Sequence, residues 1–347
     1  MHENIIGMTL ATRERNTAFD FIKCIAAFLV VCIHYAPRVS ICDMYFNAIC
    51  RVGVPLFFII TGYYYDSIKE SNKLESYIFK IIRLTFISSL FYFIVYAIEQ
   101  CIWGDFIGWF YSVFTCKNVF LWFLFNSFPV VYHLWYLYAL IYALLANVIV
   151  DKLKLTGYMP YVAIGLLILD AFLLYDAKFN SLYVRNWLMM GFPFIIIGRT
   201  ICREQSRIKC MNCQAWFFNV ILALSIVLLF VEQILLQRNN VPVRDLYVCV
   251  IPIVVIITIL AIRNPSFGAK SFVAQVGKFY SNNIYIYHIF LGSLILSQLP
   301  KSTHIMVQYI IPLLVFSISL LFSILVKYVM QRGREHKLST WIKWKKI

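Results

Sequence analysis

Long apolar runs separated by short basic clusters constrain this chain more than any other feature. Of its 347 residues, 62% are hydrophobic and only 14% are charged, and the mean hydropathy is +0.78. A soluble domain of this length does not need so much apolar surface, whereas a helix of about 20 apolar residues is long enough to cross a bilayer. The sequence therefore predicts an all-α fold, a polytopic transmembrane helix bundle.

About ten spanning helices are expected from these runs. They cover residues 19–38, 45–65, 83–102, 131–150, 158–175, 186–202, 214–236, 245–262, 280–299 and 305–329. Segment 103–130 is also apolar, but glycine and proline interrupt it. Counting it as a span would break the alternation of basic loops, so we expect it to be interfacial or re-entrant on the outer side. Lys and Arg gather in loops on the same side as both termini, which the positive-inside rule places in the cytoplasm.

This topology divides the chain into three parts. Residues 1–18 form a polar cytoplasmic segment, in which no cleavable signal peptide is expected. Residues 19–329 form the transmembrane domain. Residues 330–347 form a basic cytoplasmic tail, which we expect to contact anionic membrane lipid.

The net charge of +15 and the ten cysteines have simple explanations. The basic residues are spread between apolar runs rather than clustered, so membrane topology explains them and no nucleic-acid partner is expected. Most cysteines lie within apolar runs, where they behave as small hydrophobes. Cys210 and Cys213 form a lone CxxC pair, whereas a zinc site needs a second pair. We therefore predict no metal site.

Lys23 and His34 lie inside the first apolar run. Ionisable groups within a bilayer are costly and usually functional. The two residues are eleven positions apart, about three helical turns and about 16 Å, so they share one face. Asp20 joins this stripe, where it is expected to neutralise Lys23. His34 would then lie just past the middle of the membrane, and we expect it to be buried and neutral, the form that a base requires.

Three further basic residues are candidates on neighbouring segments. Arg51 begins the second span at a depth close to that of His34, where Gly53 and Pro55 are expected to loosen the helix. Lys80 and Arg83 are one turn apart at the cytoplasmic surface, where a basic pair suits phosphates. Membrane anchoring and the positive-inside rule are the alternative explanations for these three residues.

Two later spans open with polar side chains. His133 and Tyr136 share a face at the start of the fourth span. Ser281, Tyr285 and His288 form a polar stripe on the ninth span, at helical spacing. Helix capping or packing is the alternative role of these histidines.

Together these segments resemble the acyltransferase 3 membrane family over nearly the whole chain. The motifs that carry the resemblance are, in order, Lys23 to His34, Arg51–Phe58 with Thr61-Gly62, Lys80 with Arg83, His133-Leu134-Trp135, and Ile284-Tyr285 to His288. The chain departs from the family at Lys23-Cys24, where arginine-glycine is common, and at Thr61, where serine is common. It resembles the short form without an added soluble domain, to which the enterobacterial common antigen O-acetyltransferase belongs.

The resemblance implies a multi-pass O-acyltransferase of the bacterial cytoplasmic (inner) membrane. It would have no bound cofactor and would use acetyl-CoA as donor and a surface polysaccharide or its lipid-linked precursor as acceptor. The implied roles are catalysis by His34 and Arg51, acyl-CoA binding by Lys23, Lys80 and Arg83, and substrate binding by His133, Tyr136, Tyr285 and His288. His34 would act as general base or acyl carrier.

Several alternatives stay open at this point. The acyl group is acetyl or succinyl, and the acceptor is a glycan, a glycolipid, peptidoglycan or an antibiotic. A glycolipid transporter or flippase also needs intramembrane charges, but transporters more often show paired halves with broken helices, and none is found here. A membrane sensor or structural subunit is the third class, which the polar stripes disfavour.

Overall fold

The computed structural model describes residues 15–37, 40–175, 181–212, 214–241, 243–300 and 304–344. Within these ranges the chain is helical with connecting loops and no strand, as the sequence predicts. The helices are α1 (Thr17–Tyr35), α2 (Ile41–Cys50), α3 (Gly53–Glu70), α4 (Leu74–Trp103), α5 (Phe106–Val113), α6 (Cys116–Phe125), α7 (Trp135–Lys152), α8 (Met159–Leu174), α9 (Phe192–Arg203), α10 (Gln205–Cys210), α11 (Ala215–Arg238), α12 (Val250–Arg263), α13 (Phe272–Phe279), α14 (Ser281–Ser297) and α15 (Ile305–Trp344).

Each predicted span coincides with one of these helices or, as for residues 45–65, with two consecutive helices separated by a short break. Six of them are long and apolar enough to cross a membrane: Thr17–Tyr35, Cys42–Glu70, Leu74–Trp103, Tyr132–Lys152, Trp216–Arg238 and Ile305–Arg332. The helices Met159–Leu173 and Val250–Arg263 are apolar but shorter. The chain is thus a multi-pass helical membrane protein.

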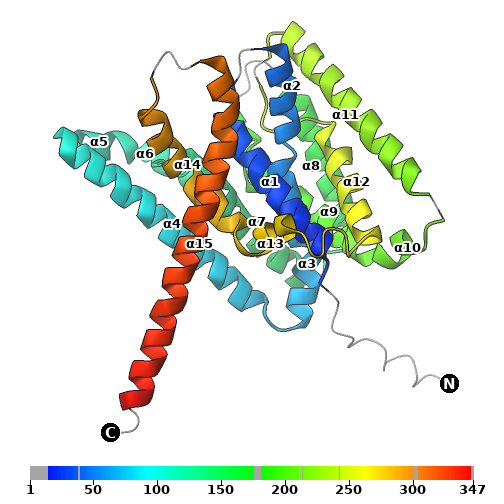
Figure 1. Cartoon of the computed structure of the whole chain (residues 1–347). Helices are drawn as coiled ribbons and strands as arrows, with labels where there is room; N and C mark the ends of the chain where they lie inside the picture. Colours follow the sequence, from blue (N-terminus) through cyan, green and yellow to red (C-terminus); the bar gives the residue numbers. More distant parts are fainter. Residues whose placement is uncertain are drawn as a thin grey trace.

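The apolar segment 103–130 forms two short helices rather than one span. Helix α5 and helix α6 are bent by 50° relative to each other across a short break, a geometry that fits either a broken span or a re-entrant loop. Figure 1 shows them beyond the end of α4, at the edge of the bundle. Their expected position on the outer side stays a prediction.

Helix α1 lies at the centre of the bundle, between α3, α13, α14 and α15. It begins at the end of the molecule where α15 also finishes, which we call the basal end, and it ends at the distal end (Figure 1). Helix α15 continues past the predicted tail boundary as far as Trp344. Residues 1–14 of the predicted N-terminal segment, and 345–347 of the tail, lie outside the described residues.

Helices α3 and α9 approach each other closely because glycine leaves room for backbone. A Cβ atom at Gly62 would overlap the main-chain carbonyl of Ile195, and one at Gly198 would overlap the carbonyl of Ile59. The two glycines therefore act as a reciprocal pair, one on each helix. Small residues at such a contact allow the dispersion and hydrogen-bond contacts that hold membrane helices together.

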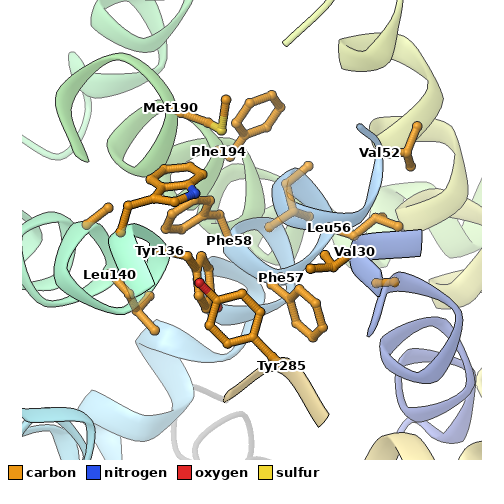
Figure 2. Packing of buried hydrophobic residues seen from close by; sticks show 14 of the residues in the cluster. Val30, Val52, Leu56, Phe57, Phe58, Tyr136, Leu140, Met190, Phe194 and Tyr285 are labelled. Atoms are coloured by element: carbon orange, nitrogen blue, oxygen red, sulfur yellow. The ribbon is translucent and has the colours of Figure 1, made fainter. Parts of the chain in front are cut away.

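An aromatic layer fills the space between α3, α7 and α14, as Figure 2 shows. The ring centroids of Phe58 and Tyr136 are 4.8 Å apart, and those of Tyr136 and Tyr285 are 5.3 Å apart. All three side chains are buried. The layer supports the polar site described next from its basal side.

A buried cation ties the basal halves of α3, α7 and α9 together. Arg199 donates to Asp66 at 2.6 Å, to Asp151 at 2.7 Å and to Asn147 at 2.9 Å. The Arg199 side chain is only 2% exposed. This network fixes three helices that are far apart in the sequence.

Candidate active site

Four of the predicted site residues line one small polar pocket, which we call the histidine pocket. Its volume is about 70 Å³, enough for a small group. The polar and aromatic residues that line it are His34, Arg51, Tyr132, His133, Trp135, Arg185, Asp245 and Tyr285. They come from α1, the α2–α3 junction, the turn before α7, the first half of α14 and two loops, so tertiary packing alone assembles the site.

His34 lies in the last turn of α1, one residue before the helix ends at Tyr35. The expectation that His34 is buried is wrong, because its side chain is exposed at the mouth of the pocket. The helix ends at Tyr35 rather than at residue 38, so His34 lies in the final turn of α1 and not in the middle of a longer helix. An accessible imidazole is what a reaction with a bound substrate requires.

Two buried histidines, His288 and His133, form a cluster with His34. The ring of His288 lies 5.2 Å from that of His34 and 5.3 Å from that of His133. Both His133 and His288 are buried. The sequence placed these three histidines on separate spans, and the fold brings their rings into one cluster.

Backbone carbonyls set the tautomers of the two buried histidines. Nδ1 of His288 lies 2.7 Å from the carbonyl oxygen of Tyr285, so this nitrogen carries the proton and donates. Nε2 of His133 lies 3.2 Å from the carbonyl oxygen of Ile286 and donates in the same way. The other nitrogens, Nε2 of His288 and Nδ1 of His133, are buried acceptors with no hydrogen-bond partner in the described structure. Unpaired buried acceptors carry a desolvation cost, and such groups occur at functional sites.

Arg51 lies at the break between α2 and α3, the position at which Gly53 and Pro55 predicted a loosened helix. Its guanidinium contacts Asp245 at 2.5 Å and donates to Oδ1 of Asn47 at 3.2 and 3.3 Å. Arg185 lies 3.8 Å from the other oxygen of Asp245. Two guanidinium groups thus share one carboxylate, which leaves the pocket positively charged and suited to an anion or an oxyanion.

Sequence reasoning missed Asp245, Arg185 and Asn47. Asp245 is 194 residues from Arg51, in the loop between α11 and α12, and no local pattern links the two. The sequence offered one signal for Asp245: it is an acidic residue beside Arg244 in a chain that is mostly apolar and basic. Arg185 also lies 5.7 Å from the ring of Trp135, so it joins the predicted His-Leu-Trp element to the loop before α9.

Tyr285 and Tyr136 hold the pocket from below. The Tyr285 hydroxyl donates to the main-chain carbonyl of His133, which ties α14 to the start of α7. Tyr136 does not line the pocket but lies one layer deeper, against Tyr285 (Figure 2). There the Tyr136 ring also packs against Phe57 and Phe58 of α3, with ring centroids 5.9 and 4.8 Å away. Tyr136 therefore supports the pocket through Tyr285 rather than lining it.

The three predicted phosphate-binding residues lie elsewhere. Lys23 is half-buried, 3.6 Å from Asp20 as expected, and 5.9 Å from the ring centroid of Tyr64. Lys80 and Arg83 are exposed on α4, and neither lines the histidine pocket. The structure therefore places the catalytic candidates and two of the four substrate-binding candidates in one pocket, with the other two packed directly behind it. It leaves the donor-binding candidates at the basal end.

A family model described as an acyltransferase domain matches residues 16–332. The chain belongs to the acyltransferase 3 family. This acyltransferase is also 26% identical to the serine/alanine racemase of Enterococcus gallinarum over 274 residues, which are 69% of the chain and 36% of that protein. The chain thus spans only part of the length of this curated relative. No solved structure matches the chain.

Metal ligands do not gather anywhere in the part of the acyltransferase that the structure describes, since no group of three His, Cys, Asp or Glu side chains has ligand geometry there. Cys213 of the CxxC pair lies outside the described residues.

Proposed function

We propose that this acyltransferase transfers an acetyl group from acetyl-CoA to a hydroxyl of a cell-surface glycan or of its lipid-linked precursor, in the bacterial inner membrane. The observation that carries the proposal is the exposed His34 imidazole in a small cationic pocket, backed by two buried histidines. A sugar hydroxyl is a weak nucleophile, and a positioned imidazole is the usual means of activating it.

In the proposed reaction, His34 takes the proton of the acceptor hydroxyl as the oxygen attacks the thioester carbonyl. The tetrahedral intermediate then collapses, the carbon–sulfur bond breaks, and the CoA thiolate takes the proton from the imidazolium. Arg51 and Arg185 face the pocket and stabilise the oxyanion in the meantime. A two-step route, in which His34 carries the acetyl group as an acyl-imidazole, uses the same contacts.

The remaining candidates have supporting roles in this proposal. His133, Tyr136, Tyr285 and His288 shape the acceptor side of the pocket, and the acceptor nitrogen of His288 is available to orient His34. Lys23, Lys80 and Arg83 are proposed to attract the CoA phosphates at the basal end, which we place in the cytosol because basic residues gather there.

The test is the glycan O-acetyl content of cells that lack the protein and are complemented with variants, measured by mass spectrometry. Wild type should restore O-acetylation and His34→Ala should not, at equal amounts of membrane-inserted protein. His304→Ala is the matched control, because His304 is also exposed but lies just before α15, outside the pocket. Restoration by His34→Ala would refute the mechanism. An unchanged acyl pattern with unmodified glycan retained inside the cell would indicate a transporter.

A further inference from the structure

A second polar cavity lies at the basal end, which we call the basal cavity. Its volume is about 430 Å³, and it lies between the start of α1, the second half of α3, α10 and the loop after α12. The lining residues that matter here are Arg15, Thr17, Tyr63, Tyr64, Lys209 and Ser266. None of its lining residues comes from α4, the helix that carries Lys80 and Arg83.

The basal cavity is built for an anion. Arg15 lines it and Lys23 stands beside it, next to Tyr64, and both contact the single carboxylate of Asp20. Lys209 adds a third cation from α10 and has no ion-pair partner among the described residues. Cations therefore outnumber carboxylates at this site. The N-terminus of α1, which is the positive end of the helix dipole, also lies at this cavity and favours an anion there.

The half-buried ring of Tyr64 gives the same cavity an aromatic wall, and the buried Tyr63 ring packs against it at 88°. The ring of Tyr64 lies 5.1 Å from that of Tyr63 and 5.8 Å from that of Phe19, so its position is fixed by neighbours on α1 and α3. The Tyr63 hydroxyl donates to Gln205 at 3.0 Å, which anchors α10 across the cavity. A fixed aromatic ring beside Arg and Lys suits a nucleotide, whose base can pack on the ring while its phosphates contact the cations.

The basal cavity also lies at a suitable depth below the histidine pocket. Val54 lines the histidine pocket and Tyr64 lines the basal cavity, ten residues further along α3, a separation of about 15 Å. Lys23 is about 16 Å from His34 along α1. An extended pantetheine arm can span such a distance, with the thioester at His34 and the nucleotide at the base.

We propose that the basal cavity binds the adenosine 3′-phosphate end of the acyl-CoA donor, with Lys209 and Arg15 on the 3′-phosphate and Lys23 nearer the diphosphate. This inference rests on the proposed function, because it assigns the donor. It also moves the nucleotide away from Lys80 and Arg83 to residues that the motif resemblance did not include.

The test compares CoA with dephospho-CoA, which lacks only the 3′-phosphate, by equilibrium binding to the full chain in nanodiscs of neutral lipid. Wild type should prefer CoA by about tenfold, the size of a lost charge-assisted contact. Lys209→Ala should remove part of that factor from CoA binding, leave dephospho-CoA binding nearly unchanged and so reduce the preference. Arg15→Gln should act in the same direction. Lys152→Ala, which removes an exposed lysine at the end of α7, should leave both constants unchanged.

Several results would overturn the inference. A preference that survives Lys209→Ala and Arg15→Gln but disappears in Lys80→Ala would place the nucleotide against α4. A wild type without any preference, together with retention of phosphatidylglycerol that depends on Lys209, would assign the cavity to a lipid headgroup. Failure of the proposed function looks different, because neither CoA form would then bind and no acetyl group would be transferred.

Discussion

Replacing Arg199 with methionine should destabilise this acyltransferase strongly, because the side chain is the central cation of a buried network. Its guanidinium bonds to Asp66, Asp151 and Asn147 at 2.6 to 2.9 Å and lies 4.2 Å from the ring of Tyr65. Methionine keeps much of the side-chain volume but removes every one of these polar contacts. Asp66 and Asp151 then lose the buried cation that they share.

The size of the effect follows from what remains near those carboxylates. Breaking a buried ion pair by removing one partner costs about 3–5 kcal/mol. Lys69 still contacts Asp151 at 2.8 Å, and Arg203 still contacts Asp66 at 3.3 Å. Asp66 is also 21% exposed, so water compensates part of the loss. We therefore expect the lower end of that range, about 3 kcal/mol.

Arg203→Met is the matched control on the same helix, with the same Asp66 partner. The Arg203 side chain is 42% exposed and makes a single contact at 3.3 Å. Exposed ion pairs contribute about 0–1 kcal/mol, so this variant should unfold almost like wild type. Arg199→Lys should fall between the two, because lysine keeps the charge but cannot reach both carboxylates with one planar group.

The assay is reversible unfolding of the purified protein in mixed detergent micelles, with helix content followed as the share of denaturing detergent rises. The expected gap between Arg199→Met and Arg203→Met is about 2–3 kcal/mol of unfolding free energy. If the two variants unfold within about 0.5 kcal/mol of each other, the buried network does not hold α3, α7 and α9 together, and the expectation is refuted.

Three further predictions follow from the packing and the site. Gly62→Ala should cost about 3 kcal/mol because its Cβ meets the backbone of α9, whereas Gly165→Ala on α8, with no atom within 4 Å, should be neutral or stabilising in the same unfolding assay. Arg51→Ala and Asp245→Ala should show a coupling energy of about 1–3 kcal/mol in a double-mutant cycle, and strict additivity would count against their ion pair. Tyr285→Phe should lower stability by about 1 kcal/mol through its lost bond to a carbonyl just before α7, while a wild-type unfolding curve would contradict that contact.

Hydropathy and local motifs determined much of the fold by themselves. The apolar runs predicted helices at every span, and the glycine and proline after Arg51 predicted the break that separates α2 from α3. Helical spacing predicted a polar stripe of Ser281, Tyr285 and His288 on the ninth span, and the three residues lie together on α14, where all are buried. These features depend on residues close together in the chain, so the sequence alone contains them.

Tertiary structure decided how those local elements meet. The pairing of Arg51 with Asp245, the network around Arg199 and the clustering of three histidines each join segments that lie far apart in the chain. The exposure of His34 also depends on how the last turn of α1 packs in the bundle, whereas the sequence alone predicted that His34 is buried. Helical periodicity determines which face a residue occupies, but only packing determines what that face contacts, because close approach of distant helices depends on side-chain shape along both of them.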